Sequence, residues 1–422
     1  MLDINTIRSS PDIVKDSLKK RGQEEKIEWV DLVLKNDKKW RQLKQKADRL
    51  REKRNKVAES INKLKKQKKS AEEAIKEARE LPPKITEIEN EMDEIKSELT
   101  SYLYRIPNIL HESVPIGKDG EENVPFRFHK EPKVPNFELK PHGQLAEERG
   151  LADFKKASKV AGAGFNYLKG DLALLDLALQ KFAIDELIKK GYKLITPPLM
   201  LNKESYEGTT DLADFEKVMY KIDKEELYLI ATSEHPLLAL HSNEVIDEKD
   251  LPLKYISLSQ CFRKEIGSRG VDTKGLFRMH QFNKVEQVII CKPEDSLKYH
   301  EELEKNSEEL YKKMGIPFRV VNVCTGDMGI VAAKKYDIEA WYPREEKYGE
   351  VGSCSNCTDY QAVRGNIKYQ DGQDRKYVHT LNNTAIATSR AMRAILENFQ
   401  NQDGSISVPK PLRKYMGKKK KI

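Results

Sequence analysis

Cysteine is scarce in this chain, and no long apolar run occurs in it. The 422 residues hold five unevenly spaced cysteines, which excludes a disulfide framework and fits a reducing compartment. No segment approaches the length of a membrane-spanning helix. The first residues, MLDINTIRSSPDIVKDSLKKRG, carry charges throughout, unlike a secretory signal. These absences predict a cytoplasmic protein with no membrane segment.

Glycine is absent from Gln23 to Ser113, where the prolines are Pro82, Pro83 and Pro107. Apolar residues in this stretch follow two heptad patterns, which predict an antiparallel helical hairpin roughly 40 Å long. A partly helical link from Gln67 to Pro83 is expected to join the two helices. The first seam is Leu43, Ala47, Leu50, Arg54, Val57, Ile61 and Leu64; the second is Ile85, Ile88, Met92, Ile95, Leu99, Tyr102 and Ile106.

The two predicted helices differ in charge. Lys35–Lys69 holds sixteen Lys and Arg against four Asp and Glu, whereas Ala71–Leu99 holds four against ten. An acidic second helix supports pairing with a basic first one. The remaining basic stripe is typical of a protein that binds a nucleic-acid backbone. An ordinary coiled coil with a lysine-rich surface stays open as the alternative.

At this length the chain can form two domains with a full-sized core. We expect an N-terminal domain at 1–112, with its arm at about 38–105, and a second domain at 113–422. Residues 113–150 are rich in Pro and Gly and predict a connector, and Lys169–Lys190 has the spacing of an amphipathic helix. Its expected apolar side is Leu172, Leu175, Leu179, Phe182 and Leu187. The basic tail KPLRKYMGKKKKI predicts disorder.

Residues Cys261–Gln287 combine arginines, a glutamate and an aromatic residue with a glycine-bearing loop. Cys261–Glu265 and Phe277–Ile290 predict two strands, and Ile266–Gly275 predicts a turn or mobile loop. Such a hairpin can hold phosphates through forked guanidinium groups and stack a base on a ring. Its side chains for these tasks are Arg263, Glu265, Arg278 and Phe282. The alternative is a charged, exposed hairpin.

This segment resembles motif 2 of the class II aminoacyl-tRNA synthetases, in the form found in seryl-tRNA synthetases. ATSEHPLLAL from Ala231 and GEVGSCSNCTDYQAVR from Gly349 agree with that family, and HTLNNTAIATSRAMRAILENFQ from His379 resembles its motif 3. Tyr192–Met200 resembles motif 1, which makes the family's dimer interface. The resemblance implies an α+β fold: an antiparallel coiled-coil arm that grips tRNA, plus a catalytic domain whose antiparallel sheet is flanked by helices.

The resemblance also implies an ATP site. Arg263 is expected at the α-phosphate, Glu265 at the adenine end and Phe282 under the adenine. Arg390, near the start of the motif 3 helix, is expected at the γ-phosphate, while Arg393 on the same helix is expected at the surface. Glu350 and Ser353 would hold the nucleotide and its Mg²⁺. The full implied set is Arg263, Lys264, Glu265, Arg278, Met279, Phe282, Glu350, Val351, Gly352, Ser353 and Arg390, with Arg263 and Arg390 as catalytic residues.

The amino-acid pocket must recognise an ammonium group, a carboxylate and one small hydroxyl. A site that bonds a hydroxyl rejects alanine, because its own polar groups would be left unpaired. Threonine would be excluded by a clash with its extra methyl group. The implied serine-binding residues are Thr232, Ser233, Glu234, Glu286, Asn382 and Thr384.

Three glycine or cysteine features depart from simple motifs. Cys354-x-x-Cys357 lacks a second ligand pair in the sequence, so zinc is not expected. Gly352 stands where the family usually has a hydroxyl residue, and Gly164 lies where it often has a basic one. The run from Ala161 to Gly164 has no dinucleotide or Walker spacing and predicts a tight turn.

The resemblance as a whole implies a serine–tRNA ligase that uses ATP and Mg²⁺. It would charge tRNA(Ser), with tRNA(Sec) as a further candidate, and act as a cytoplasmic homodimer. Two alternatives stay open: a ligase that loads an amino acid on a carrier protein, and a non-catalytic RNA-binding paralogue. The carrier-protein ligases lack the arm, and a non-catalytic paralogue should have lost phosphate ligands, yet Arg263, Glu350 and Arg390 are present.

Overall fold

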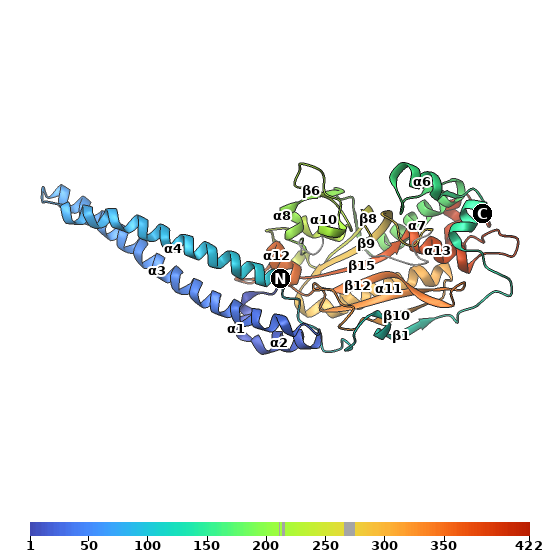
Figure 1. The fold of residues 1–422 in the computed structure, drawn as a ribbon, viewed down its shortest axis with the longest axis horizontal. Helices are drawn as coiled ribbons and strands as arrows, with labels where there is room; N and C mark the ends of the chain where they lie inside the picture. Colours follow the sequence, from blue (N-terminus) through green and yellow to red (C-terminus); the bar gives the residue numbers. More distant parts are fainter. Residues whose placement is uncertain (211, 213–215, 266–274) are drawn as a thin grey trace. The chain divides into compact units, whose positions relative to one another are not determined.

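Two long helices, α3 (Ile27–Lys66) and α4 (Glu72–Arg105), run antiparallel in the N-terminal unit, Met1–Ile109 (Figure 1). The computed structural model describes residues 1–210, 212, 216–265 and 275–422. The rest of the chain, Leu110–Ile422, forms a second unit. Short helices α1 (Ile4–Ser9), α2 (Pro11–Lys20) and η1 (Glu24–Lys26) precede the hairpin. The predicted antiparallel arm is confirmed.

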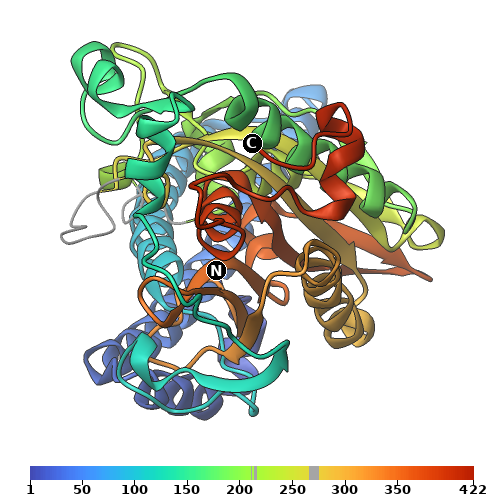
Figure 2. The same ribbon diagram turned by 90° about the vertical axis from the view of Figure 1, so that its right-hand side faces the viewer.

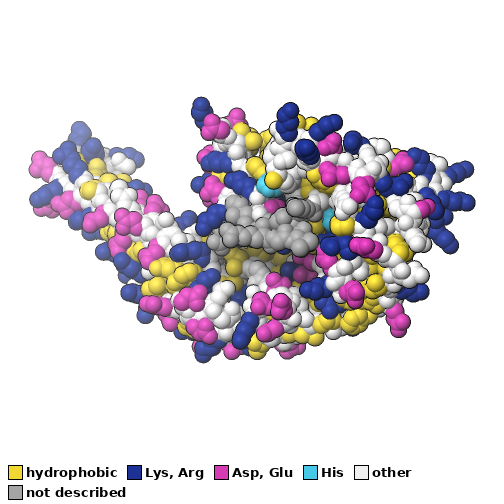
Figure 3. All heavy atoms as spheres, turned by 45° about the vertical axis from the view of Figure 1, so that its right-hand side comes forward, with side chains coloured by type: hydrophobic (Ala, Val, Ile, Leu, Met, Phe, Trp, Pro, Cys, Tyr) yellow, Lys and Arg dark blue, Asp and Glu magenta, His cyan; other side chains and the backbone are white. Residues whose placement is uncertain are grey.

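The two arm helices are joined by apolar burial and by ion pairs across the seam. Ala47 and Val57 of α3 are buried, as are Ile85, Ile88 and Ile95 of α4. Arg54, which breaks the first heptad seam, is exposed. Ion pairs cross between the helices at Lys39–Glu91, Arg51–Glu89 and Lys53–Glu77. Figure 3 shows Lys and Arg side chains in dark blue among magenta Asp and Glu side chains on the arm.

The link between the two helices is shorter than predicted. Helix α4 begins at Glu72, so that Pro82 and Pro83 lie inside it. A proline donates no N–H, so the carbonyls of Ala78 and Arg79 lose their helical partners. The helix continues because both prolines are exposed while Leu81 and Ile85 beside them are buried. The whole of α3 has 40 residues, and its part within the expected arm, from about residue 38 to Lys66, is roughly 40 Å long, as predicted.

An eight-stranded sheet forms the second unit, and its strand order is β1-β10-β11-β12-β15-β9-β8-β4. Every neighbouring pair is antiparallel except β4 with β8. This arrangement confirms the predicted α+β class. The strands are β1 (Val124–His129), β10 (Phe318–Asn322), β11 (Lys334–Tyr342), β12 (Lys347–Asn356), β15 (His379–Ala387), β9 (Gln281–Cys291), β8 (Leu253–Phe262) and β4 (Lys193–Ile195).

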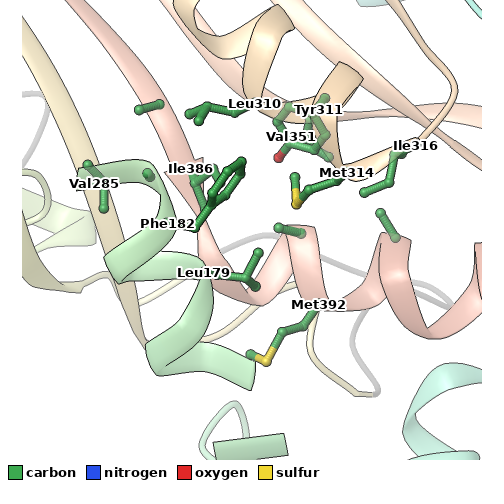
Figure 4. Close-up of a cluster of buried hydrophobic side chains, with 14 of the residues drawn as sticks. Leu179, Phe182, Val285, Leu310, Tyr311, Met314, Ile316, Val351, Ile386 and Met392 are labelled. Carbon is green, nitrogen blue, oxygen red and sulfur yellow. The ribbon is translucent and has the colours of Figure 1, made fainter. Parts of the chain in front are cut away.

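Three helices pack on one face of this sheet (Figure 1, Figure 2): α7 (Gly170–Ile188), α11 (Ser296–Met314) and α13 (Thr388–Asn398). Figure 4 shows Phe182 of α7 beside Ile386 of β15, with Met314 of α11 in the same cluster. Successive strand residues point to opposite faces, so β9 buries Val285 against these helices and turns its even-numbered residues the other way. All five residues expected on the apolar side of α7 are buried.

Smaller elements surround the sheet. The connector prediction for residues 113–150 is partly wrong, because β1 and helix α5 (His142–Glu148) lie in it. Described in the same unit are α6 (Phe154–Ala161), α8 (Lys203–Glu207), α10 (Glu234–Ala239), α12 (Tyr360–Gly365), β2 (Ala152–Asp153), β3 (Tyr167–Leu168), β5 (Met200–Asn202), β6 (Leu227–Leu229), β7 (Val245–Asp247), β13 (Lys368–Asp371) and β14 (Asp374–Tyr377).

The predicted disorder of the C-terminal tail is wrong. Residues Lys410–Met416 form a 3₁₀ helix, η7, and Leu412, Met416 and Ile422 are buried in the main core. Ile422 also exchanges two backbone hydrogen bonds with Ile406. The lysines between these anchors stay at the surface, so the composition of the tail hid its apolar contacts.

The two strands of the motif 2 segment are shorter at the loop than predicted. Strand β8 ends at Phe262 and β9 begins at Gln281. Beyond them the N–H of Arg263 still bonds the carbonyl of His280, but the N–H of Lys264 turns to Val218. Most of the predicted loop, residues 266–274, lies outside the described residues. Among the helices that the structure describes, none is both long and apolar enough to cross a membrane.

Candidate active site

A cavity of about 210 Å³ lies in the second unit, on the face of the large sheet that α7, α11 and α13 leave open. Residues of β9, β12 and β15 line it. Residues from the ATSEH segment and from the start of α13 close its sides. It brings together fifteen of the residues named from the sequence: Thr232, Glu234, Arg263, Glu265, Arg278, Met279, Phe282, Glu286, Glu350, Val351, Gly352, Ser353, Asn382, Thr384 and Arg390.

Strand β9 supplies three cavity side chains at alternate positions, Phe282, Lys284 and Glu286. The pleat places them on one face of the sheet, while the helices cover the other face. Thr384 stands directly opposite Glu286 on β15, and its Oγ1 lies 3.4 Å from Glu286 Oε2. One strand therefore carries an aromatic platform, a cation and a carboxylate in a row.

Arginines gather at one end of the cavity. The guanidinium of Arg263 lies 5.4 Å from the ring centroid of Phe282, and its Nε donates to the carbonyl of Ala231 across 3.3 Å. Arg390 Nη1 lies 2.9 Å from Glu350 Oε1, and its guanidinium lies 5.2 Å from the ring of Phe277. Forked donors beside aromatic rings suit phosphate groups and a base.

Two oxygen donors from β12 face this arginine end. Ser353 Oγ donates to Glu350 Oε1 across 3.2 Å. The charge of Arg390 is the main reason that the pKa of Glu350 falls to about 2, so this carboxylate stays ionised. Behind it, burial raises the pKa of Asp337 to about 7. An ionised carboxylate with a nearby hydroxyl is a donor set that fits Mg²⁺, which also takes phosphate and water oxygens.

The opposite end of the cavity holds two carboxylates, the half-buried Glu234 and the buried Glu286. Burial raises the pKa of both. Gln361 Nε2 donates to Glu234 Oε1 across 2.6 Å. Thr380 Oγ1 in turn donates to Oε1 of the Gln361 side chain across 2.6 Å, which fixes the orientation of that side-chain amide. A small cation with a hydroxyl group would find acceptors here.

Both units match known families. Residues 1–110 match the model described as "Seryl-tRNA synthetase N-terminal domain", and residues 217–399 match "tRNA synthetase class II core domain (G, H, P, S and T)". A protein named serine–tRNA ligase from Methanocella arvoryzae is 56% identical over 419 residues, which is 99% of each chain. The chain belongs to the seryl-tRNA synthetase family. The resemblance carried by the motifs is thereby confirmed.

Solved seryl-tRNA synthetases share the whole fold. The crystal structure from Pyrococcus horikoshii, complexed with ATP, matches with a TM-score of 0.93 and 49% identity over 100% of this chain and 99% of that chain. The cytoplasmic serine–tRNA ligase of Naegleria fowleri, in complex with AMP, gives a TM-score of 0.87 and 36% identity over 100% and 98%. Both of these structures are complexes with an adenine nucleotide.

Two residues named from the sequence do not line the cavity: Ser233, which is fully buried, and Lys264, whose ammonium lies 5.8 Å from the ring of Tyr220. Three residues with direct contacts to the predicted set were missed: Phe277, Lys284 and Gln361. The signal for Lys284 was the period of two that it shares with Phe282 and Glu286.

The prediction that Arg393 lies at the surface is wrong, because its side chain is buried and the residue is 1% exposed. Its guanidinium lies 4.1 Å from the ring of Tyr342 and donates to Glu345 and Glu397 across 2.6 and 3.1 Å. Aromatic stacking and two carboxylates make its burial favourable.

The two glycines that depart from the family's usual residues have local explanations. A Cβ on Gly164, whose φ is +83°, would lie 2.2 Å from the ring of His280. A Cβ on Gly352 would lie 3.0 Å from the carbonyl of Thr384. Both positions therefore have neighbours that favour glycine. Cys354 and Cys357 are buried, and burial raises the pKa of both thiols.

Proposed function

We propose that this chain is a serine–tRNA ligase that activates L-serine with ATP and transfers the seryl group to tRNA(Ser). The observation that carries the proposal is that one cavity brings together Arg263 and Arg390, each beside an aromatic ring, with Glu234 and Glu286. Relatives more than half identical over nearly the whole chain are named serine–tRNA ligases.

The activation step needs positioning and charge neutralisation rather than a general base. An oxygen of the serine carboxylate bonds the α-phosphorus of ATP while the bond from that phosphorus to pyrophosphate breaks. Arg263 holds the α-phosphate, Arg390 the γ-phosphate, and Phe282 stacks on the adenine. A ribose hydroxyl at the end of the tRNA then attacks the carbonyl carbon of the seryl group. An ester bond forms as the bond from that carbon to the phosphate oxygen breaks, the hydroxyl loses its proton, and AMP leaves.

Glu350 and Ser353 are the residues proposed to hold Mg²⁺ together with ATP. Their oxygen atoms are 3.2 Å apart, and Glu350 is ionised. The metal would neutralise phosphate charge as the carboxylate approaches. Arg390 already pairs with Glu350, so the same side chain links the metal ligand to the γ-phosphate position.

Serine is proposed to enter with its hydroxyl between Glu286 and Thr384 and its ammonium at Glu234. Asn382 lies on the same strand as Thr384 and completes this wall. Alanine would leave the paired groups without their hydroxyl partner, a loss that polar sites penalise strongly. Threonine would place its methyl group against the same wall.

The remaining proposals concern partners and location. The basic helix α3 is proposed to bind tRNA(Ser), with tRNA(Sec) as a further substrate. Large apolar side chains are exposed on the edge strand β1 and near motif 1, at Phe128 (66%), Leu194 (42%) and Met200 (44%). Exposed apolar edges of this kind favour a homodimer. We place the enzyme in the cytoplasm with its tRNA.

Amino-acid-dependent ATP–pyrophosphate exchange tests the proposal. Serine should support exchange, whereas alanine and the other standard amino acids should not. Glu286→Ala should weaken serine use selectively. Equal rates with serine and alanine would contradict the assignment, and no exchange at all would favour the non-catalytic paralogue. Exchange with serine but no charging of tRNA would favour the carrier-protein ligase.

A further inference from the structure

A buried carboxylate of α7 lies on the helix-covered face of the sheet. Asp176 is 6% exposed, and with residues of β9 and α13 it lines a second cavity of about 130 Å³. Its Oδ2 accepts from Gln180 Nε2 of the same helix across 2.6 Å and from Asn283 Nδ2 of β9 across 2.7 Å. Burial raises the pKa of this carboxyl, while hydrogen bonds from Thr388, Asn283 and Gln180 act in the opposite direction. One carboxylate therefore joins three elements that are far apart in the chain.

Asn283 lies where β9 loses one of its two neighbouring strands. On one side, β9 pairs with β8 from Gln281 onward. On the other side, its pairing with β15 ends at Lys284, because β15 gives way to α13 at Thr388. Among the strands that the structure describes, β8 is thus the sole partner of residues 281–283. This end of β9 is held from one side alone unless side chains replace the missing strand.

Two side chains hold β9 at this point. Thr388, which is 1% exposed, donates from Oγ1 to the backbone carbonyl of Asn283 across 3.2 Å, where a further residue of β15 would otherwise bond. Asp176 accepts from the side-chain amide of the same asparagine. Phe282, the ring proposed to stack on the adenine, precedes Asn283 on β9. Arg390, proposed to hold the γ-phosphate, follows Thr388 by two residues on α13. The bonds behind the sheet therefore connect the two ends of the proposed ATP site.

We propose that Asp176 is a positioning residue, whose carboxylate sets the separation between the ring of Phe282 and the guanidinium group of Arg390. This inference rests on the proposed function. One ATP molecule must reach both groups, so an error in their separation weakens its adenine and γ-phosphate contacts together. A misplacement of about 1 Å can cost on the order of a hundredfold in rate. The proposed serine-binding residue Glu286 should be unaffected, because β9 is paired there on both sides, with β8 and with β15.

The test removes each end of the bond between Asp176 and Asn283, with Kd for ATP measured by calorimetry and KM values by pyrophosphate exchange. Asp176→Leu and Asn283→Leu keep a similar shape but leave the other side chain without its partner. We expect each to raise the Kd and KM for ATP on the order of tenfold, with the KM for serine changed by less than about threefold. Because both variants break one bond, the double variant should be no worse than either single variant. Asp176→Asn keeps an oxygen that can accept from Asn283, and its ATP affinity should stay within about threefold of the unaltered protein.

Asp185→Asn is the matched control, since Asp185 lies on the same helix, accepts from Tyr415 across 2.6 Å and lines neither cavity. It should leave the affinity for ATP unchanged. Unchanged ATP affinity in the two leucine variants would overturn the proposal, as would an equal rise in the KM for serine or effects that multiply in the double variant. Should Asp176→Leu fail to fold, the ATP affinity of Asn283→Leu decides alone. Absence of serine-dependent exchange in an unaltered protein that binds ATP would instead contradict the proposed function, while the ATP titrations would still test the role of Asp176.

Discussion

Leu276 donates its backbone N–H to Nε2 of His142 across 3.1 Å, while Nδ1 of the same ring lies 3.2 Å from Glu397 Oε1. Because Nε2 accepts, the ring proton sits on Nδ1 and is donated to Glu397. The imidazole thus ties the segment that leads into Phe277 and the ATP end of the cavity to helix α13. Gly275 makes this contact accessible: its φ is +99°, and a Cβ there would lie 2.3 Å from His142 Nε2.

Replacing Gly275 with alanine should displace this segment and weaken ATP use. We expect the KM for ATP to rise on the order of tenfold or more, as small misplacements in a positioned site do, with little change in the KM for serine. Gly372→Ala is the control, because Gly372 also has a positive φ, +59°, but open space around it. Pyrophosphate exchange measures both constants. Equal effects of the two variants would show that backbone strain alone explains the Gly275→Ala result, and would contradict a role for the contact with His142.

The two arginines of α13 should separate activity from stability. Arg393→Met leaves the fully buried Glu397 without its cation, and breaking a buried pair costs about 3–5 kcal/mol. Arg390→Met should instead abolish exchange while the melting temperature changes little, because its partner Glu350 keeps 42% side-chain exposure. Thermal unfolding and exchange measured on both variants check this. A stable, inactive Arg393 variant would reverse the two roles.

Stability should depend on the protonation of Glu304 in α11. Its side chain is fully buried, and neither carboxylate oxygen accepts a hydrogen bond from the described residues. Burial is the main reason that its pKa rises to about 8 from an ordinary value of 4.5. The folded protein therefore holds a proton that the unfolded chain releases, and stability is lost as the pH rises through this interval.

Glu304→Gln should remove that loss. Relative to the unaltered protein, the variant should gain on the order of 3 kcal/mol between pH 5 and pH 8. Urea unfolding at the two pH values measures the difference. Glu309→Gln, on the same helix with a side chain 46% exposed, is the control and should show no comparable trend. A gain that is the same at both pH values would point to packing instead of protonation.

The arm offers a test of charge with its seam intact. Lys46, Arg49, Arg54 and Lys63 of α3 are exposed, and none of them forms an ion pair with a described carboxylate. Changing these four to glutamine should raise the KM for tRNA and make its salt dependence shallower, since fewer counterions are released on binding. Serine activation should be unaffected.

The matched control neutralises the other helix. Glutamine at the exposed Glu73, Glu87, Glu94 and Glu98 of α4 removes four charges of opposite sign from the same hairpin. It should leave tRNA binding as strong as before or stronger. Aminoacylation at several salt concentrations measures both variants. If the two sets weaken charging equally, the basic stripe is only a solvated face of the coiled coil.

The sequence patterns predicted the fold better than they predicted the residues that depart from those patterns. The heptads predicted the arm, and motif resemblance named most of the side chains that share the cavity. Lys284 and Arg393 were missed because long cations are exposed by default, and only tertiary partners reveal a buried one. The tail was misread for a related reason: three buried apolar residues outweigh the lysines between them. The link was expected to run to Pro83, although packing against α3 carries the helix through Pro82 and Pro83.

Pro82 and Pro83 make α4 easier to bend at one point along its length. Two consecutive backbone hydrogen bonds are missing at a point about 15 Å from the start of the helix, by the rise of 1.5 Å per residue. Bending stiffness in a helix comes from the unbroken ladder of backbone bonds, and kinks concentrate where it is interrupted. A force applied at the turn between α3 and α4 therefore bends α4 at the two prolines. The longer part of the helix, from Lys84 to Arg105, moves as a rigid rod.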